Sequence, residues 1–226
     1  MAEVFEKRAN SASAQVKAVL FDLDGTLLDT YQLILSSMRY TIQTVLGQDL
    51  PDERLMEKVG QPLVTQLADF ADDPEMVEKL VSVYREHNEK HHDSVVRAFA
   101  GMRETLEALK GAGLVLGVVT SKRHELAQRG LDIAGLAPYM SFVVGPDDWP
   151  EHKPAPGSVL HGCRLAGFDA SECAYVGDSP FDLQAGNGAG CFTVAVLWGM
   201  FDEAVLRAQQ PDAVCAEPHE IVELFV

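Results

Sequence analysis

The chain has 226 residues, of which 47% are hydrophobic and 23% are charged, a composition typical of a globular protein with one packed core and a smaller accessory domain. Its 34 acidic residues outnumber 18 basic ones, which gives a formal net charge of −16. Such a surface repels nucleic-acid phosphates and anionic lipid headgroups. We therefore expect no nucleic acid and no membrane among its partners.

The N-terminal residues and the cysteines indicate where the protein is located. Residues 1–15 are polar, carry charges of both signs and lack the apolar stretch of a signal peptide, so we interpret them as a flexible tail. The cysteines have neither CxxC spacing nor zinc-finger spacing to a histidine, which is typical of reduced thiols. These features predict a cytoplasmic protein.

The first predicted element is a strand over residues 16–21, a continuous apolar run of the kind that is buried on both faces. About eighty residues with helical patterning follow. Residues 31–46 predict one helix, stopped by Gly47, and Asp73-Pro74 opens another long one. This stretch is too long for a simple crossover connection. We therefore predict a helical cap over residues 30–99.

Strands and helices alternate through the rest of the chain. Apolar runs predict strands at 114–119, 140–144, 173–176 and 192–197, and helices are expected at 102–112, at 122–134, from 156 to about 167, and from 180 onward. This alternation predicts a parallel, doubly wound sheet. The predicted fold is thus α/β: a Rossmann-like core formed by residues 16–29 and 100–226, with an inserted α-helical cap.

Two carboxylates follow the first strand, in the segment Phe21-Asp22-Leu23-Asp24-Gly25-Thr26. Because side chains alternate along a strand, Asp22 and Asp24 can point the same way and form a site for a hard cation. One carboxylate can attack while the other moves a proton. Gly25 permits a tight turn that exposes backbone N–H groups to an anion. The alternative is a turn with strand-ending aspartates and no chemistry.

Polar residues also follow the other predicted strands: Thr120-Ser121, then Lys153, then Asp178 and Asp182. Ligands of an open α/β sheet bind outside the carboxyl ends of its strands, so these residues should converge in one crevice. Each has a structural alternative: Thr120 as a helix cap, Lys153 as a solvated loop residue, and Asp182 as the acidic member of a capping box opened by Ser179.

The segments DLDGT, VVTS, HKP and GDSPFD, in this order, resemble the four motifs of the haloacid dehalogenase-like hydrolase superfamily. By that resemblance Asp22 is a nucleophile that forms an aspartyl-phosphate, and Asp24 is the general acid/base. Thr120 binds the phosphoryl oxygens, and Lys153 neutralises charge. The resemblance also implies Mg²⁺ held by Asp22, the Asp24 carbonyl and Asp178, with Asp182 orienting Lys153 or the metal's waters.

The expected substrate is inferred from the sequence of the cap. It resembles that of the phosphoglycolate phosphatase group, and residues 84–93 look more like its pyrophosphatase branch. We expect the substrate to be a small phosphorylated metabolite or pyrophosphate, with pyrophosphate ranked above phosphoglycolate and sugar phosphates third. The predicted substrate-binding residues are Gly25, Thr26, Ser121, Gln61 and His91. Asn88 and His92 extend the same polar stripe. A solvated helix end is the simpler explanation of this stripe.

Other interpretations remain open. A sugar-phosphate mutase of the same superfamily would return the phosphoryl group to its substrate, and a non-catalytic phosphate-binding protein would not turn over. Residues 185–190 are rich in glycine. We interpret them as a frayed helix rather than a dinucleotide-binding loop, because they follow a helix and not a strand. We expect a monomer or a homodimer.

Overall fold

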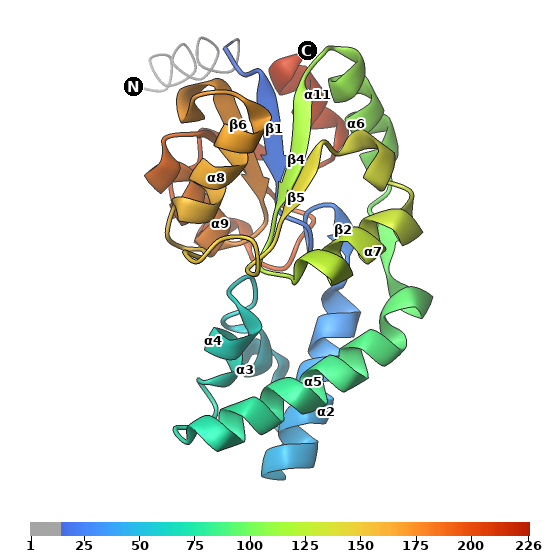
Figure 1. Cartoon of the computed structure of the whole chain (residues 1–226), viewed down its shortest axis with the longest axis vertical. Coiled ribbons are helices and arrows are strands. Elements are labelled where there is room, and N and C mark those ends of the chain that lie inside the picture. The colour runs from blue at the N-terminus through green and yellow to red at the C-terminus, as the bar shows by residue number, and fades with distance from the viewer. Residues whose placement is uncertain (1–14) are drawn as a thin grey trace.

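The computed structural model describes residues 15–226, so nearly all of the predicted tail lies outside the described residues. Six parallel strands form the main sheet in the order β5-β4-β1-β6-β7-β8 (Figure 1). They are β1 (Ala18–Phe21), β4 (Val115–Val119), β5 (Phe142–Val144), β6 (Cys173–Gly177), β7 (Phe192–Val196) and β8 (Ala213–Cys215). The parallel, Rossmann-like α/β fold is confirmed. The edge strand β8 has only three residues and was not predicted.

Helices cover both faces of this sheet. Side chains of α6 (Met102–Gly111), α7 (His124–Ala134) and α11 (His219–Phe225) pack on one face. Those of α8 (Gly157–Ala166) and α9 (Pro180–Ala189) pack on the other. Strand β1 sends Val19 and Phe21 to the first face and Ala18 and Leu20 to the second. It is buried on both sides, as its continuous apolar run predicted. The short helix α10 (Glu203–Arg207) lies between β7 and β8.

Four helices lie between β2 (Leu28–Asp29) and β3 (Arg97–Ala98) in the chain and form a unit with its own apolar core. They are α2 (Tyr31–Leu46), α3 (Asp52–Met56), α4 (Leu63–Leu67) and α5 (Pro74–Val95). The short antiparallel strands β2 and β3 pair where the chain enters and leaves this unit. Figure 1 shows the helical unit below the carboxyl ends of the main strands, where it covers the site described below. We call it the cap.

Helix α9 corrects one expectation. The glycine-rich segment was expected to fray, but α9 continues to Ala189 and ends at Gly190, whose φ of 81° is left-handed. A Cβ on Gly186 would collide with the Thr193 side chain, so this glycine lets the helix lie close to the sheet. Tertiary packing therefore compensates for the low helix propensity of glycine here.

No helix in the described part of the chain is both long enough and apolar enough to span a bilayer.

Candidate active site

The turn after β1 begins the site. Asp22 continues the strand, since its N–H donates to the Val176 carbonyl at 2.9 Å. Gly25 then adopts a left-handed φ of 85°, and its N–H donates to the Leu28 carbonyl at 2.9 Å. A Cβ at this position would collide with the Asp178 carboxylate. Glycine is therefore required here both by the backbone conformation and by the close approach of a second carboxylate.

Three carboxylates meet below this turn. Asp22, Asp178 and Asp182 each place one oxygen within 4.8 Å of the others, and all three side chains are buried. Lys153, which is 3% exposed, donates to Asp22 Oδ1 at 2.7 Å and to Asp182 Oδ1 at 2.5 Å. The structure thus brings together four residues from three separate segments, as expected for the carboxyl edge of a parallel sheet.

The charges of this cluster do not cancel, because one ammonium faces three carboxylates. Burial, opposed by Lys153 and assisted by Asp182, raises the pKa of Asp22 to about 7. Burial and then the neighbouring Asp182 and Asp22 raise the pKa of Asp178 well above its usual range. For Lys153, Asp182 and Asp22 outweigh burial and raise the pKa of the ammonium. A divalent cation would supply the missing positive charge, and the oxygen donors fit a hard ion.

Asp182 has two roles at once. Its Oδ2 accepts from the Ser179 N–H at 3.0 Å and from the Ser179 hydroxyl at 2.6 Å, and the Asp182 N–H donates back to that hydroxyl. This capping box begins α9. Its Oδ1 meanwhile accepts from Lys153. The capping box and the contact with Lys153 are therefore compatible, because each uses a different oxygen of Asp182.

Asp178 is oriented by its neighbours. The Thr26 hydroxyl donates to Asp178 Oδ1 at 2.9 Å, and the Met200 N–H donates to Oδ2 at 2.8 Å. Thr26 is fully buried, so the structure places its side chain behind the carboxylate rather than against a substrate. The prediction that Thr26 contributes to substrate binding gains no support from this side chain, whose hydroxyl restricts the rotamer of Asp178.

Thr120 and Ser121 both lie at the cavity, as predicted. Thr120 Oγ1 accepts from the Lys122 N–H at 3.2 Å, a local contact of the kind expected for a cap, and the side chain still lines the cavity. The Ser121 hydroxyl donates to the carbonyl of Gly60 in the cap at 2.7 Å. Ser121 thus joins the core to the cap directly.

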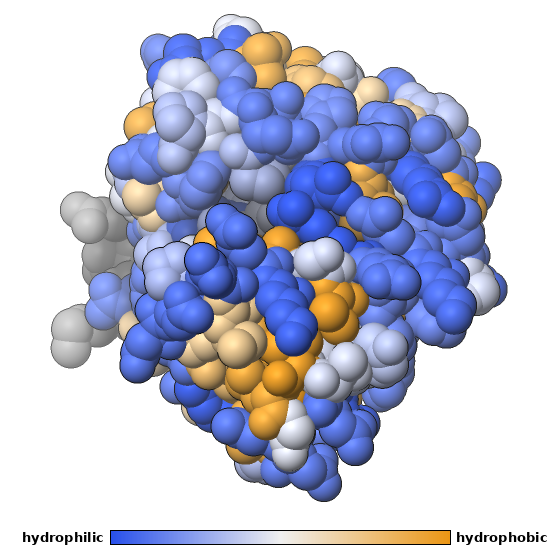
Figure 2. Space-filling model, turned by 60° about the horizontal axis from the view of Figure 1, so that its bottom comes forward, coloured by the Kyte–Doolittle hydropathy of each residue, from blue (hydrophilic) through white to orange (hydrophobic). Residues whose placement is uncertain are grey.

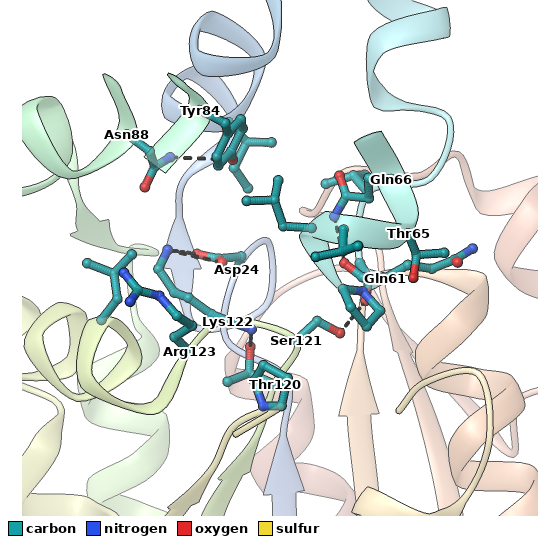
Figure 3. A pocket seen from close by; sticks show the side chains of 18 of the residues that line it. Asp24, Gln61, Thr65, Gln66, Tyr84, Asn88, Thr120, Ser121, Lys122 and Arg123 are labelled. Atoms are coloured by element: carbon teal, nitrogen blue, oxygen red, sulfur yellow. Dashed lines mark hydrogen bonds and ion pairs between the residues drawn. The ribbon is translucent and has the colours of Figure 1, made fainter. Parts of the chain in front are cut away.

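Lys122 was missed by the sequence analysis. Its ammonium lies 2.9 and 3.1 Å from the two oxygens of Asp24 (Figure 3). It directly follows the polar pair at the end of β4, so a cation beside that strand end was the available signal. Lys122 places a partly buried positive charge beside the carboxylate expected to move protons.

A cavity of about 330 Å³ opens between the core and the cap. Its core wall includes Asp22, Asp24 and Thr120, and its cap wall includes Gln61 and Asn88 (Figure 3). Several apolar side chains complete the lining: Ile34, Val59, Leu63, Val64, Tyr84 and Leu126. Figure 2 views the molecule from the cap side, where hydrophilic residues predominate around one apolar stretch.

The polar stripe on α5 enters the cavity only in part. Asn88 lines it, with its amide donating to Ser37 Oγ and Tyr84 OH at 3.3 and 3.4 Å. His91 does not line it: this side chain is exposed and its ring centroid lies 4.6 Å from that of His87. His92 is fully buried. For His91, the structure agrees with the alternative of a solvated helix surface.

Fold and site together define an α/β protein with an acidic cluster at the carboxyl edge of a parallel sheet and an inserted helical cap above it. Residues 19–196 match the model of the haloacid dehalogenase-like hydrolases. The chain belongs to this family.

Relatives across the full length support the assignment. A protein named putative pyrophosphatase PpaX from Caldanaerobacter subterraneus is 38% identical over 211 residues, which cover 93% of this chain and 95% of that protein. Pyrophosphatase PpaX of Halalkalibacterium halodurans is 34% identical over 210 residues, with 93% and 97% covered. The crystal structure of a predicted phosphoglycolate phosphatase from Haemophilus somnus is similar, with a TM-score of 0.85, 25% identity, and coverage of 94% of this chain and 99% of that one.

Proposed function

We propose that this protein is a Mg²⁺-dependent phosphohydrolase that acts through an aspartyl-phosphate on Asp22. One observation carries the proposal: a buried carboxylate at the floor of a cavity contacts the Lys153 ammonium at 2.7 Å, beside the second buried carboxylate of Asp178. Asp22 and Asp178 would hold the metal with the Asp24 carbonyl. When bound, Mg²⁺ supplies positive charge to the phosphoryl oxygens.

In the proposed reaction, Asp22 attacks phosphorus, a new P–O bond forms and the bond to the leaving group breaks. Asp24 gives its proton to the leaving oxygen and then takes one from the water that hydrolyses the aspartyl-phosphate. Lys153 keeps its charge throughout, because two carboxylates raise its pKa. Thr120 positions the phosphoryl oxygens. A phosphoryl transition state gains mainly from this kind of positioning and charge neutralisation.

Pyrophosphate is the first candidate substrate, supported by the names of the relatives and by the polar groups of the cap wall. Phosphoglycolate is the second. A specific observation favours an organic leaving group: several apolar side chains line a cavity of about 330 Å³, including Ile34, Leu63 and Leu126. We further propose that residues 30–99 act as a cap that closes over the leaving group and selects the substrate.

Substitution of the two aspartates tests the proposal. Asp22→Asn should abolish turnover with Mg²⁺, because an amide cannot attack phosphorus. Asp24→Asn should slow hydrolysis of the intermediate, so that a phosphorylated protein accumulates and is detected by intact-protein mass spectrometry. Asp49→Asn, at an exposed cap position, is the matched control and should keep full activity.

The same experiment separates the alternatives. Steady-state activity of Asp22→Asn above background would contradict the aspartyl-phosphate mechanism. A mutase would transfer the phosphoryl group to a sugar phosphate and release little inorganic phosphate. A phosphate-binding protein would show no turnover in the wild type with pyrophosphate, phosphoglycolate or a generic aryl phosphate.

A further inference from the structure

The proposed function explains the floor of the cavity but leaves its cap wall without a role. We propose that Arg85, on α5 of the cap, binds a second anionic group carried by the leaving group of the substrate. This inference rests on the proposed function and deepens it, because it names the residue that selects substrates whose leaving group carries a second anionic group.

Three lysine or arginine side chains line the cavity: Arg85, Lys122 and Arg123. Lys122 contacts both oxygens of Asp24, and Arg123 forms an ion pair with Glu89 on the cap. For Arg85, no hydrogen bond, ion pair or aromatic contact is found within residues 15–226. Its charge is the one among these three that remains available to a ligand.

The carboxylates at the floor limit where a second anion can lie. Asp22, Asp178 and Asp182 gather there, and the Lys153 ammonium already contacts two of them. A further anionic group next to them would be repelled, so it must extend from the reacting phosphorus toward the cap. Arg85 is on that side, on the helix that also carries Tyr84 and Asn88 into the cavity lining.

Neutral hydrogen-bonding side chains line the same cap wall as Arg85. Thr65 of α4 and Gln61 of the preceding loop line the same cavity, and α4 packs against α5. Neither side chain makes a hydrogen bond within the part of the chain that the structure describes. Figure 3 shows both on the wall formed by the cap. An anion between α4 and α5 would therefore meet a guanidinium together with neutral donors.

These features define the ligand by its chemistry. A guanidinium presents a planar fork of donors that matches a phosphate or a carboxylate. The second phosphate of pyrophosphate and the carboxylate of phosphoglycolate both qualify. A neutral aryl group does not need Arg85, and it can occupy the apolar part of the lining.

The test compares Arg85→Gln and Arg85→Lys with Lys79→Gln, an exposed lysine on the same helix that does not line the cavity. Turnover is measured with pyrophosphate, phosphoglycolate and p-nitrophenyl phosphate. Loss of a hydrogen bond to a charged group predicts a decrease in kcat/KM of about 10- to 100-fold for the two anionic leaving groups. Most of it should appear in KM. The aryl phosphate should change by less than about threefold, Arg85→Lys should recover part of the loss, and Lys79→Gln should match the wild type.

A binding measurement gives a readout that needs no turnover. Methylenediphosphonate, a non-hydrolysable pyrophosphate analogue, and inorganic phosphate are titrated calorimetrically into each variant with Mg²⁺ present. Arg85→Gln should weaken binding of the diphosphonate far more than binding of phosphate. Equal losses for all ligands, or none, would overturn the role of Arg85. If the wild type hydrolyses no substrate, the proposed function fails, and the titration still decides whether Arg85 recognises the second anion.

Discussion

Lys153 is buried between two carboxylates, and its removal tests how charge is distributed in the site. Lys153→Met would leave Asp22 and Asp182 buried without their cation. Breaking a buried ion pair costs about 3–5 kcal/mol, so we expect loss of activity together with a large decrease in the free energy of unfolding. Urea denaturation measures the stability, and phosphate release measures the activity.

A double variant serves as the control for Lys153. Adding Asp182→Asn removes one of the two unpaired charges, so part of the stability should return, while activity should not. The prediction would be wrong if Lys153→Met were as stable as the wild type. It would also be wrong if the double variant were active.

At the scale of the element, α5 carries a buried histidine near its end. The His92 ring is fully buried, and Nδ1 lies 3.0 Å from Asp93 Oδ1. Burial lowers the pKa of His92 below its ordinary value of 6.5; Lys122 acts in the same direction, whereas Asp93 and Asp24 oppose it. The folded state therefore holds the neutral ring, and its Nε2 has no hydrogen-bond partner in the described residues.

This shift predicts a dependence of stability on pH. The His92 ring binds a proton more readily in the unfolded chain than in the folded one. Its contribution to stability is therefore fully present above the ordinary pKa of 6.5. That contribution decreases as the pH falls from there toward the lowered pKa of His92 in the folded state. His92→Gln should reduce that slope, measured by urea unfolding across this range. Lys79→Gln, at an exposed position near the start of the same helix, should leave the slope unchanged. Equal slopes in the wild type and in His92→Gln would contradict the prediction.

At the scale of the whole molecule, the excess negative charge of the site should couple metal binding to folding. Mg²⁺ should raise Tm, because an ion that binds only the folded state stabilises it by about 2.7 kcal/mol at a hundred times its Kd. Asp178→Asn should raise Tm without metal, since it removes a repelled buried carboxylate, and should largely abolish the response to Mg²⁺. Differential scanning calorimetry with and without chelator provides the measurement.

An exposed acidic residue provides the comparison for this metal effect. Glu107→Gln, on the surface of α6, changes the net charge by the same amount and should keep the wild-type response to Mg²⁺. The same shift in Tm for Asp178→Asn and the wild type would mean that the carboxylate cluster does not hold the ion.

Local sequence patterns were sufficient to predict much of the fold and of the candidate site. The apolar run before Asp22 predicted β1, and Asp73-Pro74 predicted the start of α5, which has an Asp73 N-cap and Pro74 at its first position. Such signals depend on residues close together in the sequence, so they can be recognised without knowledge of the fold. The strand ends also predicted that Asp22, Lys153, Asp178 and Asp182 would meet, because a parallel sheet gathers its carboxyl ends at one edge.

Other features depended on contacts between distant segments. The strands β2 and β3 have two residues each, and β8 has three, so their pairing partners define them and their own patterns do not. The pairing of Lys122 with Asp24 joins residues 98 positions apart. His91 and Asn88 are three positions apart on one helix, yet only Asn88 lines the cavity. The packing of α5 on α2 decides which side of α5 faces the cavity.

The amino-acid sequence by itself thus determined five of the six strands of the main sheet, the two long helices of the cap and the identity of the charged residues at the strand ends, because periodicity and capping act over a few residues. Only the tertiary structure decided which of those residues touch. It turned the Thr26 hydroxyl toward Asp178, used the Ser121 hydroxyl to join the core to the cap, and left Arg85 facing the cavity without a partner among the described residues. These outcomes depend on the packing of the cap against the core, which no local pattern encodes.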